Sequence, residues 1–215
     1  MKNDYLYIQY TQCYFSLRKA VGLIGMLLPF VLMLGNHLFF GGEAVLPTIS
    51  QYYHSPMRDV FVGALLIMAS FLFFYSGYGK TDRIFGIVAG SLALGVVFFP
   101  TSASATSSDG QVHGFFAISL FVVLAAISIF DFPRKRPGME KRNTDTLQVI
   151  SGLVMLGCVI AVCLYYAFRG FAKSEGYFVF ILESIALIAF GISWFTEGLD
   201  LKNELAIKEG DVNNK

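Results

Sequence analysis

The sequence predicts an all-α integral membrane protein, a bundle of six transmembrane helices with both termini in the cytoplasm. Composition is the first reason, because 55% of the 215 residues are hydrophobic, only 14% are charged, and the mean hydropathy is +0.62. A soluble domain carries about 25% charged residues. The second reason is that the apolar residues come in long runs. A run of about 20 apolar residues spans a bilayer as a helix, since a helix satisfies its own backbone hydrogen bonds there.

Six apolar runs define the predicted spans, which are residues 20–40, 60–77, 84–99, 112–130, 147–168 and 177–195. The third run is short, and it fits a bilayer that thins locally or a helix that stands upright. Its small residues, among them Gly86, Gly90 and Gly95, predict a face on which another helix of the bundle approaches closely. We therefore expect a transmembrane domain of residues 1–199, followed by a polar cytoplasmic tail of residues 200–215.

The distribution of Lys and Arg predicts the orientation. These residues gather in the N-terminal segment, in the second connection and in the fourth connection, DFPRKRPGMEKRN, whereas the third connection, PTSASATSSDGQ, contains none. Because positively charged residues resist translocation, both termini and the even-numbered connections are expected in the cytoplasm. The localisation predicted from this pattern is a multi-pass protein of the plasma (inner) membrane.

Several classes of function are disfavoured by what the sequence lacks. No block of Lys and Arg is interleaved with aromatic residues as in a nucleic-acid-binding groove, so no nucleic-acid partner is predicted. The G-x-S-x-G, HExxH and P-loop patterns are absent as well. The three cysteines, Cys13, Cys158 and Cys163, form neither a disulfide framework nor a CxxC metal pair.

Polar residues gather on the predicted outer side of the membrane. The first outer connection, PTISQYYHSPMRD, contains Ser50, Tyr53, His54, Arg58 and Asp59. His113 opens the fourth span, and Glu183 lies about two turns into the sixth. A carboxylate at the centre of a bilayer costs roughly 2.5–3.5 kcal/mol, so such residues usually face the bundle interior and mark a functional site.

Each of these residues also has a purely structural explanation. His54 fits a solvated loop, and Asp59 is favourable at the N-terminus of the second helix because of the helix dipole. His113 and Glu183 favour a function, because both project into the membrane where ionisable groups are expensive. A histidine oriented by a carboxylate and close to a hydroxyl group can catalyse acyl transfer, and the same residues can also hold a lipid head group by hydrogen bonds.

A metal site is the alternative. Two or three histidines with carboxylates can bind zinc and leave one position open for a water molecule that the metal activates, and His54, Asp59, His113 and Glu183 are the candidate ligands. The spacing of Ser50, His54 and Asp59 is similar to that of alkaline-ceramidase-like membrane hydrolases. Those enzymes also place an H-x3-H pair on the last of seven spans, and this chain has neither feature. The sequence therefore predicts no cofactor, with zinc as the alternative.

Three short motifs carry a resemblance to a known group of membrane proteins. The first, PTISQYYHSP, includes Ser50; the second, VHGFFA, includes His113; the third, ESIALIAFGISWF, begins with Glu183. In these motifs the chain resembles the Frag1/DRAM/Sfk1 group of six-span proteins and related bacterial families of unknown function. It departs from that group at Ser184, where a tryptophan is usual, and at residues 51–53, which replace Asp-Thr-Gly or Asp-Leu-Gly. Because eukaryotic members are associated with GPI-anchor lipid remodelling, lipid asymmetry and autophagy, the resemblance implies a lipid-related role.

The leading functional hypothesis is a protein that binds or remodels a membrane lipid in an outward-facing polar pocket. Ser50, His113 and Glu183 are the predicted catalytic residues, and the predicted substrate-binding residues are Tyr53, His54, Arg58 and Asp59. A metal-dependent membrane hydrolase is the second hypothesis, and a non-catalytic scaffold or small transporter is the third. The sequence leaves the oligomeric state open.

Overall fold

The computed structural model describes residues 2–75, 79–101, 108–133, 144–169 and 176–213. In these residues the chain is all-α, as the sequence predicts, and no strand is present. The elements are α1 (Lys2–Phe40), the 3-10 helix η1 (Ile49–His54), α2 (Arg58–Phe74), α3 (Lys80–Phe98), α4 (Ser108–Ala126), the π-helical segment η2 (Ile127–Asp131), α5 (Thr144–Arg169) and α6 (Phe178–Asn213).

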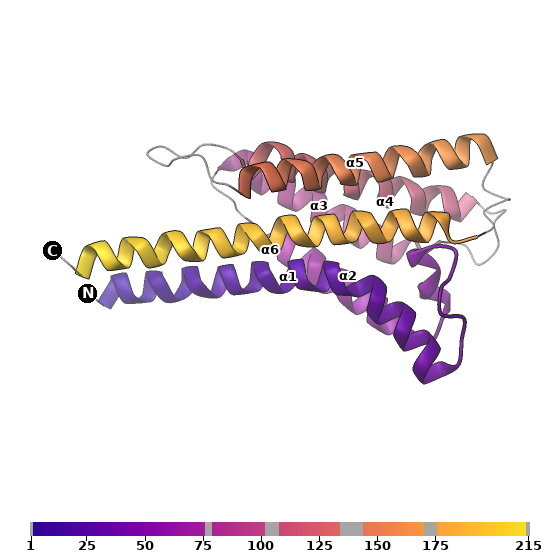
Figure 1. The fold of residues 1–215 in the computed structure, drawn as a ribbon, viewed down its shortest axis with the longest axis horizontal. Helices are drawn as coiled ribbons and strands as arrows, with labels where there is room; N and C mark the ends of the chain where they lie inside the picture. The colour runs from indigo at the N-terminus through magenta and orange to yellow at the C-terminus, as the bar shows by residue number, and fades with distance from the viewer. Residues whose placement is uncertain (1, 76–78, 102–107, 134–143, 170–175, 214–215) are drawn as a thin grey trace.

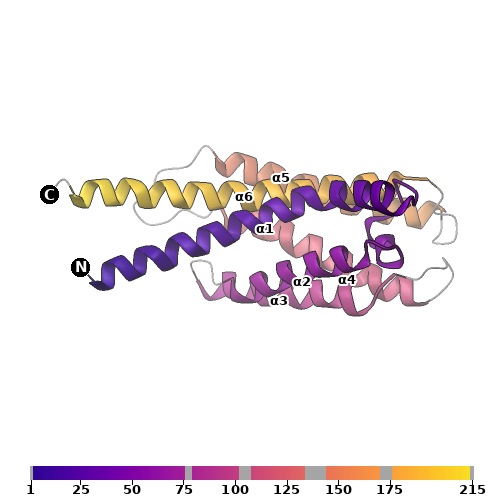
Figure 2. The same cartoon turned by 90° about the horizontal axis from the view of Figure 1, so that it is seen from below.

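The helices run side by side along the long axis of the molecule (Figures 1 and 2). α1 packs against α6, α2 against α3, and α5 against both α4 and α6. Both ends of the chain lie at one end of the bundle, and the connection that holds η1 lies at the other (Figure 1). Pro29 lies inside α1, and the C-terminal part of that helix turns away from α6, as expected where proline removes a backbone hydrogen bond.

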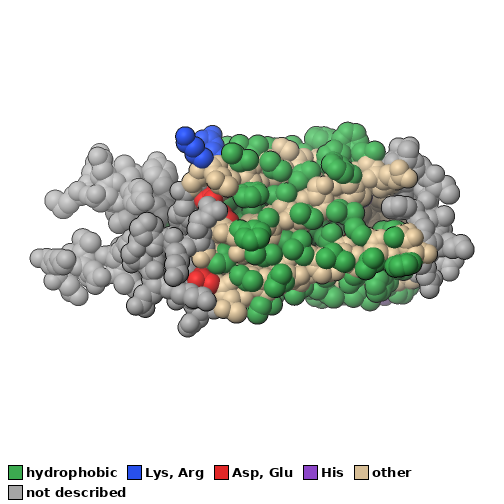
Figure 3. All heavy atoms as spheres, turned by 90° about the horizontal axis from the view of Figure 1, so that it is seen from above, with side chains coloured by type: hydrophobic (Ala, Val, Ile, Leu, Met, Phe, Trp, Pro, Cys, Tyr) green, Lys and Arg blue, Asp and Glu red, His purple; other side chains and the backbone are tan. Residues whose placement is uncertain are grey.

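Five helices in the described part of the chain are long and apolar enough to cross a membrane, and the chain is therefore an integral membrane protein. Their apolar segments are Gln12–Phe40, Lys80–Phe98, Gly110–Asp131, Thr144–Phe168 and Phe178–Leu199. α2 is also apolar, but its 17 residues fall short of the about 20 that cross the full hydrocarbon core. Figure 3 shows a broad band of hydrophobic side chains on one face, with the visible Lys, Arg, Asp and Glu side chains at one end of the band.

Two helices extend beyond their predicted spans. The first predicted span begins after Arg18 and Lys19, because two adjacent cations usually mark the membrane surface. In the structure α1 continues through both residues, and the Arg18 side chain is only 1% exposed. α6 likewise continues to Asn213, so it runs through most of the segment assigned to the polar tail.

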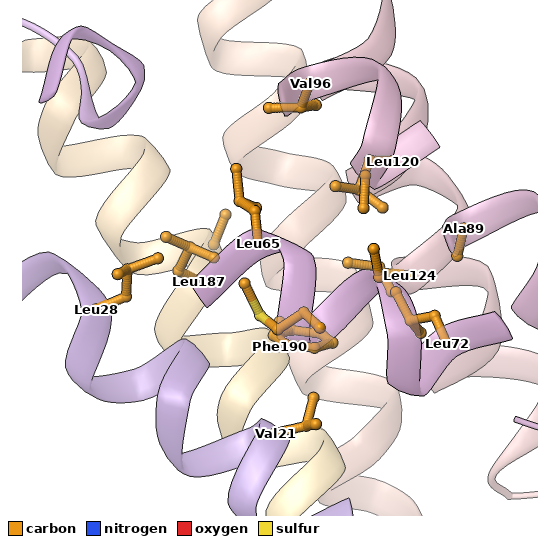
Figure 4. Close-up of a cluster of buried hydrophobic side chains, with 14 of the residues drawn as sticks. Val21, Leu28, Leu65, Leu72, Ala89, Val96, Leu120, Leu124, Leu187 and Phe190 are labelled. Carbon is orange, nitrogen blue, oxygen red and sulfur yellow. The ribbon is translucent and has the colours of Figure 1, made fainter. Parts of the chain in front are cut away.

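Glycines allow the closest helix contacts. A Cβ atom added to Gly22 of α1 would lie 2.7 Å from the carbonyl oxygen of Gly191 in α6, so only glycine permits this approach. In α3, a Cβ atom on Gly86 would lie 2.6 Å from the carbonyl oxygen of Leu72 in α2. The close-packing face predicted in the third span is therefore an interface within the bundle. Behind these contacts, buried apolar side chains from α1, α2, α3, α4 and α6 point toward one another (Figure 4).

Candidate functional site

The connection between α1 and α2 folds over one end of the bundle and places Ser50. The Thr48 hydroxyl accepts a hydrogen bond from the Gln51 N–H at 3.1 Å and starts η1. The Pro47 carbonyl accepts a hydrogen bond from the Phe180 N–H at 3.0 Å, which ties the connection to the start of α6. Burial raises the pKa of the Tyr52 phenol, which therefore stays protonated and donates to the Ala44 carbonyl at 2.7 Å.

Ser50 and His113 form a hydrogen-bonded pair. The Oγ atom of Ser50 lies 2.8 Å from Nε2 of His113, and Nδ1 of His113 lies 2.9 Å from the carbonyl oxygen of Phe99. Because a carbonyl oxygen only accepts, Nδ1 carries the hydrogen of the neutral ring. Nε2 is then the acceptor, and the Ser50 hydroxyl donates to it. This is the protonation state in which a histidine can act as a general base toward a serine.

Glu183 lies against the backbone of the same segment. Its Oε2 atom accepts a hydrogen bond from the Ile49 N–H at 2.6 Å, and the Ser50 N–H also faces this carboxylate. The sequence suggested that a carboxylate orients His113, whereas the structure gives that position to the Phe99 carbonyl. Glu183 instead holds the beginning of η1, and it fixes Ser50 through the backbone.

The four predicted substrate-binding residues lie on the outer surface of this connection. The guanidinium carbon of Arg58 lies 4.6 Å from the centre of the Tyr53 ring, and an Arg58 Nη atom donates to the Tyr53 hydroxyl at 3.0 Å. Nε2 of His54 lies 2.6 Å from the carbonyl oxygen of Thr101. Asp59 is exposed in the first turn of α2, the helix-start position that the sequence predicts. None of these four side chains lines the cavity beneath Ser50.

A cavity opens beneath Ser50 and Glu183. The centre of a water-sized sphere fits within about 60 Å³ of it, and its total empty volume, which includes adjoining open solvent, is about 660 Å³. Among the described residues that line it, Ser50 and Glu183 are the only ones with polar side chains, and the others are aliphatic or aromatic. Most of the cavity-lining residues labelled in Figure 4, such as Leu65, Leu120 and Leu187, come from α2, α4 and α6. Ser50 and Glu183 thus lie at the edge of an otherwise apolar cavity.

The predicted zinc ligands are not assembled. Across residues 2–75, 79–101, 108–133, 144–169 and 176–213, no group of three or more His, Cys, Asp or Glu side chains is placed to hold a metal ion. Of the four candidates, His113 bonds to Ser50 and Phe99, His54 approaches the Thr101 carbonyl, and Glu183 accepts from the backbone. We therefore build no mechanism on a metal at this site.

A second group of polar side chains, which the sequence analysis missed, lies near the end of the bundle that holds the termini. We call it the inner polar cluster, and it consists of Arg18, Tyr75, Asp131, Gln148 and Glu197, all less than 3% exposed. Arg18 donates to the Tyr75 hydroxyl at 3.3 Å, and this hydroxyl donates to Asp131 at 2.7 Å. Gln148 donates to Glu197 at 2.6 Å, while Arg18 lies 3.9 Å from Glu197.

Aromatic rings surround the cation of this inner polar cluster. The guanidinium carbon of Arg18 lies 4.6 to 5.1 Å from the ring centres of Phe132, Tyr75 and Trp194. Asp131 belongs to this cluster and is the last residue of η2. In this π-helical segment the backbone hydrogen bonds span one residue more than in an α-helix. The available sequence signal was a polar residue near the same end of several predicted spans, such as Gln148 in the span 147–168 and Asp131 directly after the span 112–130.

Comparisons with known proteins give no match: no family model, no curated protein and no solved structure matches this chain.

Proposed function

We propose that this chain is a six-span protein of the plasma (inner) membrane that binds a membrane lipid in its outward-facing site and transfers or hydrolyses an acyl group of that lipid. One observation carries the proposal: Ser50 lines an apolar cavity, and its hydroxyl donates to a buried histidine. A serine activated in this way is a nucleophile for esters. An ester with an apolar chain, in a protein that lies in the bilayer, is most simply a lipid ester.

The proton transfers of this reaction need only the side chains of Ser50 and His113. His113 Nε2 takes the Ser50 proton as Oγ attacks the ester carbonyl carbon, and the bond from that carbon to the alcohol oxygen then breaks. The protonated histidine returns the proton to the leaving alcohol. Water or a second alcohol attacks the acyl-serine in the same way and regenerates Ser50. In this scheme Phe99 and Glu183 are positioning residues, because they hold His113 and η1 without touching the reacting atoms.

The resemblance noted in the sequence supports the same site. Its three motifs contribute Ser50, His113 and Glu183, which come from η1, α4 and α6 and meet at one end of the bundle. For the six-span topology we count α2 as a span, because its apolar sequence lies between η1 and the other end of the bundle. Both termini then lie in the cytoplasm, and Ser50 faces outward.

The surface residues favour a phosphate-bearing head group. Arg58 is exposed at the start of α2, after the connection that holds Ser50, and its guanidinium is already oriented by stacking on Tyr53. A guanidinium binds phosphate through two parallel hydrogen bonds, so a phospholipid whose ester reaches Ser50 can place its phosphate near Arg58. We therefore assign Arg58 and Tyr53 to the head group, with His54 and Asp59 at the edge of this surface.

The test is an acyl-release and acyl-transfer assay in vesicles that contain isotopically labelled phospholipid. Wild-type protein should release or transfer labelled acyl groups, and Ser50→Ala should lose this activity. Ser184→Ala is the matched control, because Ser184 lies one residue after Glu183 and its hydroxyl only bonds back to the Phe180 carbonyl. Equal activity in wild type and Ser50→Ala would contradict the proposal. Retained lipid without turnover in wild type would leave a lipid-binding protein that performs no chemistry.

A further inference from the structure

We infer that the cavity beneath Ser50 binds a single acyl chain about as long as one bilayer leaflet is thick, so that the protein selects its lipid by chain length. This inference rests on the proposed function and names its substrate class: a lipid ester whose reacting chain enters the bundle while the head group stays outside.

The depth of the cavity matches one leaflet. On α2 the lining runs from Phe61 to Leu72, a rise of about 16 Å at 1.5 Å per residue. On α6 it runs from Glu183 to Phe190, a rise of about 10 Å. One leaflet is about 15 Å deep, half of a hydrocarbon core of about 30 Å. A chain that leaves the outer leaflet and enters here can therefore extend for most of its length.

The width of the cavity admits one chain. The lining extends over two to three helical turns, yet the centre of a water-sized sphere fits within only about 60 Å³ of this space, so the cavity is narrow. A sterol ring or a pair of chains is wider than such a channel, whereas one flexible chain can thread it. Water is a poor occupant, because it needs polar partners and the only polar side chains lie at one end.

The two ends of the cavity determine where a bound acyl chain lies relative to the Ser50 hydroxyl. Ser50 and Glu183 stand at the end beneath η1, so a chain that fills the cavity holds its carbonyl group near Ser50 Oγ. At the other end Phe190 closes the lining, with its ring centre 5.6 Å from that of Trp194. Trp194 in turn packs on Arg18 of the inner polar cluster, so the floor is backed by a network that an apolar chain does not penetrate.

Ala93 provides the sharpest test of this inference. It is 1% exposed and lines the cavity from α3, so Ala93→Leu replaces a methyl group with a larger isobutyl group inside the channel. Ala20→Leu is the matched control, because Ala20 is exposed on α1 and the same substitution there leaves the cavity unchanged. Ala117→Leu is a second filling variant, from α4, in case Ala93→Leu does not fold.

The measurement is the affinity of polymer-solubilised, full-length protein for lysophosphatidylcholines of increasing chain length, with Ser50→Ala as background to prevent turnover. Affinity should rise by about fourfold for each methylene that enters the cavity and then stop rising near leaflet length. Ala93→Leu should move that limit to shorter chains, and Ala20→Leu should leave it in place.

The outcomes separate this inference from the proposed function. Chain-length dependence that is identical in Ala93→Leu, Ala117→Leu and the Ser50→Ala background overturns the acyl-chain assignment, even if wild-type protein turns over lipid esters. A limit that shifts as described upholds the assignment, even if the vesicle assay detects no turnover. In that case the cavity binds a chain and the proposed chemistry is wrong.

Discussion

The Ser50 hydroxyl and the His113 imidazole, 63 residues apart in the chain, lie 2.8 Å apart at one end of the bundle. The pair forms because η1 is fixed from two sides: Glu183 accepts the Ile49 N–H, and the Pro47 carbonyl accepts the Phe180 N–H. His113 is fixed in turn by the Phe99 carbonyl at the end of α3. Three helices and a 3-10 turn thus converge on one hydroxyl group.

Replacing His113 tests the general base. We expect His113→Gln to lower the rate of acyl release by about 10²- to 10⁴-fold, the usual contribution of a positioned base. Glutamine can keep a hydrogen bond to the Phe99 carbonyl but cannot take the Ser50 proton. Rates in the labelled-phospholipid assay, with circular dichroism to show that the variant folds, check this expectation. An unchanged rate in folded protein would remove His113 from the mechanism.

Replacing Glu183 tests its role as a cap of η1. Glu183→Ala leaves the buried Ile49 N–H without its acceptor, which should lower the free energy of unfolding by about 1–3 kcal/mol. Glu183→Gln retains a side-chain oxygen that can accept the same hydrogen bond, and we expect it to recover most of the loss. Unfolding by SDS titration in mixed micelles measures both. Equal losses in the two variants would show that the negative charge, rather than the hydrogen bond, holds η1.

The inner polar cluster should contribute strongly to stability. Arg18→Met removes a cation packed among three aromatic rings and leaves the buried Glu197 without it. Removing one partner of a buried ion pair usually costs about 3–5 kcal/mol. The double variant Arg18→Met/Glu197→Gln should lose less, because residue 197 then carries no uncompensated charge. Lys19→Met is the control at the next position, and a cost as large as that of Arg18→Met would argue against a specific role for the cluster.

The contact between α1 and α6 should tolerate no added side chain. A Cβ atom at Gly191 would lie 2.5 Å from the Gly22 carbonyl oxygen, so Gly191→Ala forces the two backbones apart. Overpacking of this kind costs about 1–3 kcal/mol. Gly157→Ala on α5 has open space around the new atom, and the higher helix propensity of alanine should leave stability equal or slightly higher. Thermal unfolding in detergent distinguishes the two, and equal midpoints would contradict the packing argument.

Much of the helical layout followed from the sequence, because long apolar runs have few alternatives in a bilayer. The meeting of Ser50 with His113 also lay within reach, since both were placed on one side of the membrane. The Phe99 carbonyl was not predictable, because every residue carries a carbonyl and only the fold selects one. Arg18 was misplaced for a different reason: a cation near the end of a span usually marks the surface, and nothing local indicates that three rings enclose it.

Labelling by a fluorophosphonate probe tests the central claim most directly, because the probe reacts only with an activated serine and forms a stable bond to it. We would treat purified wild type, Ser50→Ala, His113→Gln and Ser184→Ala, and then identify the modified peptide by mass spectrometry. The account predicts labelling at Ser50 in wild type and in Ser184→Ala, strongly reduced labelling in His113→Gln, and none in Ser50→Ala. Wild-type protein that binds lipid but leaves Ser50 unlabelled would contradict the claim that this hydroxyl is a nucleophile.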